Sequence, residues 1–173
     1  MIVYDMLIRL FKKFIIFFLV IFYSLQLQLF ATDDTNIEID RPRFTEKGLN
    51  DRLYEIKAER GIQKKNNLEL FAVEGKFRTN SGIWVYLNAD QGNFNQIKNV
   101  IELNGNIIFY TDKNEKFHSE YASFYINEDI IEFNKNVKHI RGENIVTSDA
   151  SVVKNNFSNI IYQGNVKTFY IND

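Results

Sequence analysis

Apolar and polar positions alternate along most of the chain after residue 40, and the alternation restarts after short polar breaks. In residues 54–59, for example, Tyr54, Ile56 and Ala58 fall on one face of an extended chain. Turn-forming residues interrupt the pattern roughly every 8–15 residues. Because no amphipathic helix of any length follows residue 40, the pattern predicts an all-β chain, a sandwich or an open β-jellyroll of stacked antiparallel strands.

One short motif recurs at a spacing of about 30 residues, as in repeat proteins. It consists of apolar residues two positions apart, then a Gly-Asn or Lys-Asn step, then a β-branched residue. Its copies occupy residues 101–107, 131–137 and 160–166. Gly and Asn tolerate positive φ, so each copy predicts a strand, a sharp bend and a new strand.

A second motif keeps a similar spacing and consists of one large apolar residue followed by two small ones. Its copies begin at Ile56, Leu87, Phe117 and Ile145, the last running to Thr147 and Ala150. Small side chains suit bulges and close backbone approach. Two motifs with one spacing favour stacked β-layers over the chance period of a simple meander.

The large residues of each strand gather on one face, which we expect to be the inner face. They form either ordinary core or, if the fold is incompletely closed, a lipid-binding trough for apolar chains, and the period alone does not distinguish these readings. The inner-face residues are Leu70, Leu87, Phe94, Leu103, Phe109, Phe117, Phe124, Phe133, Tyr162 and Val166.

Residues 1–31 read as a membrane anchor. Arg9, Lys12 and Lys13 precede an uncharged run over residues 14–31, which as a helix would be about 27 Å long, close to the thickness of a bilayer core. Acidic residues follow at once, which predicts a cytoplasmic N-terminus and a translocated remainder. The alternative is a cleaved signal peptide, but Leu29 stands where a site ending at Ala31 needs a small residue.

The rest of the chain divides into a polar, acidic linker over residues 32–41 and one β-domain over residues 42–173. Phe44 and Tyr54 belong to an expected opening hairpin. Linker and domain together carry 18 basic and 21 acidic residues once the anchor is set aside, and no basic patch stands out, so nucleic-acid binding is not expected. The absence of Cys excludes disulfides and thiolate metal sites.

Candidate chemistry is sparse. The two histidines, His118 and His139, have no nearby carboxylates at metal-ligand spacing, and His118 is expected to be a half-exposed strand residue. The sequence shows neither a nucleophile elbow nor a glycine-rich phosphate loop. We therefore expect no enzyme activity, no metal site and no cofactor.

Taken in order after the anchor, the motifs resemble the LptC family, the inner-membrane-anchored periplasmic components of lipopolysaccharide export. The resemblance covers essentially the whole chain. It rests on Pro42-x-Phe44-Thr45, Tyr54-x-Ile56-x-Ala58, Leu103-x-Gly105-Asn106-Ile107, Ser119-x-x-Ala122 and the terminal Gly164-Asn165-Val166. Lys135 departs from the pattern, because the sister repeats have Gly there, and the anchor is unusual in containing Gln26 and Gln28.

The resemblance implies a periplasmic β-jellyroll whose trough holds the acyl chains of lipid A and which catalyses nothing. Lipopolysaccharide would arrive from an inner-membrane ABC transporter and pass to the periplasmic bridge protein LptA. Phe44 and Tyr54 would mark the sheet edge that meets the transporter, and Ile160, Phe169 and Ile171 the edge that meets the bridge protein. Alternatives are a soluble bridge protein with a cleaved signal peptide, or a structural β-repeat domain without lipid cargo.

Overall fold

The computed structural model describes residues 36–47, 53–79, 81–155 and 157–170. The predicted anchor and Ile171 lie outside these residues. Within them, no helix is long and apolar enough to cross a membrane.

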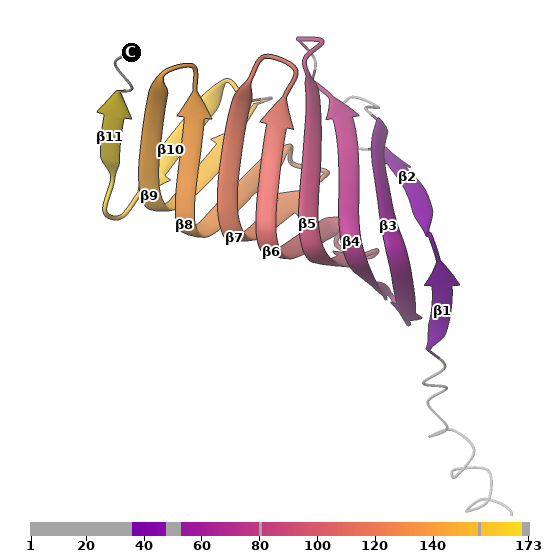
Figure 1. Cartoon of the computed structure of the whole chain (residues 1–173). Helices are drawn as coiled ribbons and strands as arrows, with labels where there is room; N and C mark the ends of the chain where they lie inside the picture. The colour runs from indigo at the N-terminus through magenta and orange to yellow at the C-terminus, as the bar shows by residue number, and fades with distance from the viewer. Residues whose placement is uncertain (1–35, 48–52, 80, 156, 171–173) are drawn as a thin grey trace, which may run out of the picture. The chain divides into compact units, whose positions relative to one another are not determined.

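The described residues form one open antiparallel sheet of 11 strands, so the all-β prediction is confirmed. From β3 to β10 each strand pairs with its neighbours in chain order, as Figure 1 shows. The strands are β1 (Ile37–Asp40), β2 (Arg43–Lys47), β3 (Leu53–Lys64), β4 (Asn67–Arg78), β5 (Trp84–Asn95), β6 (Val100–Thr111), β7 (Glu115–Tyr125), β8 (Ile130–Arg141), β9 (Asn144–Lys154), β10 (Asn159–Gln163) and β11 (Lys167–Tyr170).

The long strands bend near their middle, and the sheet folds over along this line of bends, which we call the corner (Figure 1). The pairing of β5 through β9 shifts register there because β6 and β8 each carry an extra residue. The extra residues belong to the steps Gly105-Asn106 and Lys135-Asn136, all four at positive φ. The first two copies of the first sequence motif are therefore β-bulges, which bend their strands and increase the local twist, whereas the third copy falls at the break between β10 and β11.

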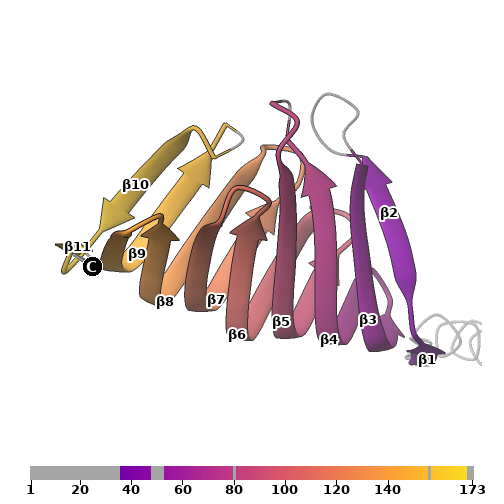
Figure 2. The same cartoon turned by 45° about the horizontal axis from the view of Figure 1, so that its top comes forward.

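The corner divides the sheet into two layers. Layer A comprises β2, β11 and the strand halves in register with them, and layer B comprises β1, β10 and the opposite halves. The first and last strands are each interrupted at the corner, so that β1 and β2 both pair with β3 and β10 and β11 both pair with β9 (Figure 2). The predicted opening hairpin is β2–β3, whereas residues 37–40, which we assigned to the linker, form β1.

The core fills the space between the layers, and its aromatic rings interleave. Phe77, Phe109 and Phe117 come from layer A, and Phe124 and Phe133 come from layer B. Ring centroids lie 5.3 Å apart for Phe77–Phe124, 5.1 Å for Phe109–Phe133 and 5.0 Å for Phe117–Phe133. These contacts join the two layers along the stack of strands.

The second motif marks where odd-numbered strands cross the corner, and its last copy is shifted by one residue from the sequence prediction. The Ser119 hydroxyl donates a hydrogen bond to the carbonyl of Tyr121, and the Ser148 hydroxyl donates in the same way to Ala150. Ser148 is therefore the equivalent of Ser119, and the copy begins at Val146 rather than Ile145. The corrected copy starts 29 residues after Phe117, the offset that also separates the last two copies of the first motif.

Candidate functional site

The fold brings most of the predicted inner-face residues together between the layers. Each of the following is at most 3% exposed: Leu70, Leu87, Phe94, Leu103, Phe109, Phe117, Phe124 and Phe133. Their side chains belong to one hydrophobic cluster. The interior is thus filled by the protein's own side chains, and a long apolar ligand would have to separate the layers to enter it.

The last two inner-face residues lie at the C-terminal end of the stack and differ from the others. Tyr162 is half-buried, and Val166 is 49% exposed and does not line the interior. Val166 holds the repeat position of Ile107 and Val137, each only 1% exposed. Those two residues are covered by the next strands, whereas no described strand follows β11.

The predicted N-terminal edge is partly corrected. Tyr54 is fully buried on β3, with its ring centroid 4.9 Å from that of Phe77, and β2 covers its strand, so Tyr54 is not an edge residue. Phe44 does lie on the edge strand β2. Its ring stacks on Phe94 at a centroid distance of 5.0 Å, which binds this edge to layer B.

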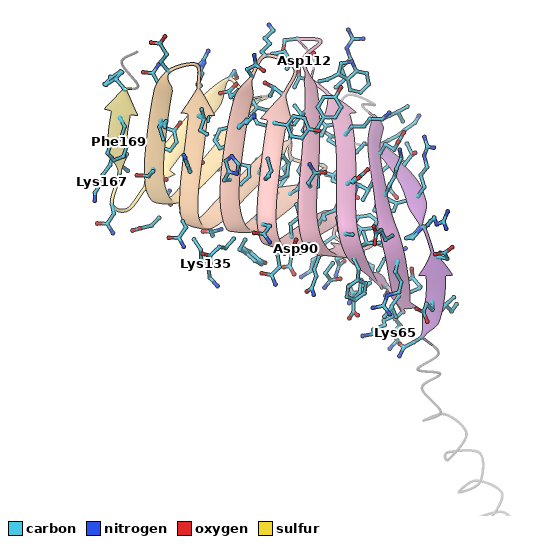
Figure 3. The ribbon with its side chains drawn as sticks, in the orientation of Figure 1. Lys65, Asp90, Asp112, Lys135, Lys167 and Phe169 are labelled. Carbon is cyan, nitrogen blue, oxygen red and sulfur yellow. The ribbon has the colours of Figure 1, made fainter. Side chains whose placement is uncertain are left out.

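The C-terminal edge is the more apolar of the two. Phe169 is 51% and Tyr170 72% exposed on β11, which lies at the end of the sheet in Figure 3, and Ile161 is 42% exposed on β10. Ile160 instead packs against the core. In the described part of the chain β10 and β11 pair only with β9, so their outer edges have no strand beside them. Exposed apolar edges of this kind are usually avoided or covered.

A polar cluster that the sequence analysis missed joins the two layers near this end. Ring nitrogen Nε2 of His139 lies 2.9 Å from the Glu115 carboxylate, and Nδ1 is hydrogen-bonded to the Tyr162 hydroxyl. His139 is 4% exposed and its ring stacks on Phe117 at 4.0 Å. Glu115 is 24 residues away in sequence and reaches His139 only through the pairing of β7 with β8. No short sequence pattern therefore predicts this contact.

The surroundings of this cluster disfavour added negative charge. Burial raises the pKa of Tyr162, the Glu115 carboxylate raises it further, and Arg141 offsets part of the effect. The neighbouring Ser151 is fully buried, and its hydroxyl has no hydrogen-bond partner among the described residues. The end of the interior nearest β10 is therefore more polar than the rest.

The outward-facing residues of the two layers differ in charge. On layer A, which we call face A, eight basic residues accompany two acidic ones; on layer B, called face B, three basic residues accompany five acidic ones. Face A carries Arg43, Lys47, Lys57, Lys76, Arg78, Lys116, Lys138 and Lys167 with Glu55 and Glu74, and face B carries Arg60, Lys64 and Lys154 with Glu38, Asp40, Glu69, Glu102 and Glu132.

The expectation that no basic patch exists was therefore wrong, because the fold collects basic residues that are scattered along the sequence. His118 also lies on face A and is half-buried, as predicted. Burial lowers its pKa, and the positive charges of Lys138 and Lys116 lower it further.

Among the described residues, no three His, Asp or Glu side chains gather closely enough to hold a metal ion. The sequence matches no known family model, and no curated protein is similar enough to count as a relative.

Proposed function

We propose that this protein is a non-enzymatic lipopolysaccharide-binding scaffold of a transenvelope export machine, in the manner of the LptC family. In this proposal residues 1–31 anchor the chain in the inner membrane and the β-domain works in the periplasm. It receives lipopolysaccharide from an ABC transporter and passes it to a bridge protein of the LptA type.

The observation that carries the proposal is the continuous apolar interior of a sheet that is open at both ends. Its layers are joined by backbone only along the corner, and elsewhere side-chain contacts such as Phe109–Phe133 hold them together. Acyl chains entering between the layers would exchange these contacts for similar ones. Because each buried CH₂ contributes about 0.8 kcal/mol, a few methylenes stabilise such a complex without any cationic contact.

The edges support the second half of the proposal, the handover between neighbours. A strand from another protein can add to an open edge through main-chain hydrogen bonds, with alternate side chains giving specificity. At the C-terminal edge Phe169, Tyr170 and Val166 already expose the apolar surface that such a strand would cover. At the N-terminal edge β1 and β2 pair with β3 alone among the described strands, so another strand can add on their outer side.

A photo-crosslinking experiment in cells tests the lipid cargo. A photoreactive residue at Phe133 or Leu103, which face the interior, should capture lipopolysaccharide, whereas one at Glu132, the outward neighbour of Phe133, should not. The pair Phe133 and Glu132 is matched because both lie on β8 in layer B. Equal labelling at the two positions would contradict an interior lipid site.

The filled interior favours a second candidate, a structural β-repeat domain without cargo. Phe109, Phe117, Phe124 and Phe133 are all fully buried, and close packing of this kind needs no ligand for stability. Mass spectrometry of lipids extracted from the protein purified out of membranes separates the candidates. Copurifying lipopolysaccharide supports the export proposal, and its absence together with absent crosslinks supports the structural one.

A further inference from the structure

Face A combines its excess of positive charge with aromatic rings that are exposed or half-buried. Trp84 is 37% exposed at the end of β5, and the cations of Lys76 and Arg78 lie 6.0 Å and 5.9 Å from its ring centroid. Beside it Tyr86 and Tyr110 stack on each other at 5.1 Å. In Figure 3 layer A is the front layer, and the turn that holds Asp112 marks this aromatic end of it.

The positive charge is largely uncompensated toward β7 and β8. Glu55 forms ion pairs with Arg43, Lys57 and Lys76 at distances of 2.9 to 3.8 Å. The carboxylates of face A therefore neutralise mainly the cations of β2 to β4. Around Lys116 and Lys138 face A offers no carboxylate in register. The lowered pKa of His118 between these two lysines has burial as its first cause and their positive charges as the second.

We propose that face A docks on the surface of a bilayer that contains anionic lipids. Lys and Arg side chains gain energy near anionic headgroups, and Trp and Tyr rings favour the level of the headgroups. Surfaces that bind single-stranded nucleic acid also combine cations with aromatic rings, so the apolar run that precedes the domain is what favours a bilayer as the partner. Face B, with its excess of acidic residues, would be turned toward water.

The sequence before β1 limits how far the domain can lie from a bilayer. The uncharged run that ends at residue 31 is followed by only five residues before Ile37. Five extended residues span at most about 18 Å, so insertion of the run would keep the domain beside a bilayer. The inference concerns the outer surface alone and is independent of the proposed function: docking through face A lays the stack of strands along the bilayer, whereas handover to a bridge protein needs the stack to stand upright on it.

Trp84 reports on the docking directly, because it is the only tryptophan in the chain. The full chain is reconstituted into vesicles of phosphatidylcholine alone or mixed with phosphatidylglycerol, each with brominated acyl chains that quench tryptophan at the bilayer. We expect strong quenching and a blue shift of emission in the anionic vesicles at low salt, and weak quenching at high salt or in the neutral vesicles.

Two matched triple variants locate the docking surface. Arg78→Gln/Lys116→Gln/Lys138→Gln removes three cations from face A, and Arg60→Gln/Lys64→Gln/Lys154→Gln removes three from face B. Each cation near the surface changes the ratio of docked to free domain about fivefold, so the first variant should lose most of the quenching and the second should keep it. Circular dichroism establishes that both variants are folded.

Two results would overturn the proposal. The first is quenching that is equal in neutral and anionic vesicles, or equal in the two variants. The second is unquenched Trp84 in anionic vesicles while the protein binds heparin through the three cations of face A, which would assign this surface to a soluble polyanion instead.

Discussion

Asn106 and Asp90 lie side by side on the neighbouring strands β6 and β5 at the corner, and the Asn106 side-chain amide donates a hydrogen bond of 2.8 Å to the Asp90 carboxylate. The same relationship joins Asn165 to Asp149 at 2.9 Å and Asn136 to Glu120, always with a separation of 16 residues. Figure 3 shows Asp90 and Lys135 on this side of the sheet. Bulges interrupt the backbone ladder at Asn106 and Asn136, and the break between β10 and β11 interrupts it at Asn165. Each side-chain bond therefore holds neighbouring segments together where the strand pairing is interrupted.

Replacing Asn106 by Ala should lower the free energy of unfolding by about 1–2 kcal/mol, which denaturant titration measures. The change removes the hydrogen bond to Asp90 and places Ala at φ 45°, a conformation that Asn tolerates better. Asn104→Ala is the control, because Asn104 is exposed two residues earlier on the same strand outside the bulge. Equal losses of unfolding free energy in the two variants would show that the hydrogen bond at the corner contributes no particular stability.

Gly105→Ala tests the space at the same bend. An added Cβ would lie 2.6 Å from the Asp90 carboxylate oxygen, and φ is already 79°. Gly142 has φ 57° but nothing within 4 Å of such a Cβ, so Gly142→Ala costs only backbone strain of about 1 kcal/mol. We expect Gly105→Ala to cost about 2–3 kcal/mol in thermal or chemical unfolding, since Asp90 must also move and give up its bond to Asn106. If Gly105→Ala lowered the free energy of unfolding by less than Gly142→Ala does, an added Cβ at residue 105 would not be crowded by Asp90.

The motifs that predicted the bends did so because bulges have a local chemical requirement. Gly105, Asn106 and Gly164 are readable in the sequence because positive φ restricts the residues that fit. Ser148 was harder to place, because Thr147 and Ser148 are both small and the sequence alone does not show which one faces inward. The bond from Ser148 to Ala150 decides it.

Relationships between distant strands were not predictable in the same way. Lys116 and Glu132 are close in sequence, yet they lie on opposite outer faces, because β7 crosses the corner between them. When charges are counted along a short stretch of sequence, the basic residues of face A are therefore offset by acidic residues of face B. Glu115 and His139 meet for the converse reason: strand pairing brings together residues that the sequence separates by a whole hairpin.

The link between Tyr162 and His139 should give the protein a distinct response to alkaline pH. Burial raises the pKa of Tyr162, so the folded chain holds the phenol proton more tightly than the unfolded chain does. Stability that is present below the ordinary value near pH 10 is then lost as the pH rises through the folded-state pKa. Tyr162→Phe lacks this loss, although at pH 8 it should be about 1 kcal/mol less stable because His139 loses a hydrogen-bond partner.

The measurement is urea unfolding of both proteins from pH 8 to pH 11. The difference between wild type and Tyr162→Phe should shrink or reverse above pH 10. Tyr125, whose pKa is also raised by burial, is present in both proteins and drops out of the comparison. Tyr170→Phe, which removes an exposed phenol, serves as the control. A difference that stays constant across this range would show that Tyr162 ionises equally in the folded and unfolded chains.

His118 reports the electrostatic potential of face A. Burial lowers its pKa first, and Lys138 and Lys116 add to the effect, so the imidazole stays neutral at a pH at which a free histidine is partly charged. Removing positive charge with Lys116→Gln/Lys138→Gln should raise the pKa of His118 toward its ordinary value, as measured by NMR titration of the ring protons. Added salt should raise it in the wild type and have less effect in the double variant, since screening and substitution remove the same repulsion.

Lys154→Gln on face B should leave the titration of His118 unchanged, and a shift of similar size in that variant would mean that the two faces do not differ in local potential. Because His118 remains partly buried in every variant, whatever lowering persists after both lysines are replaced measures burial alone.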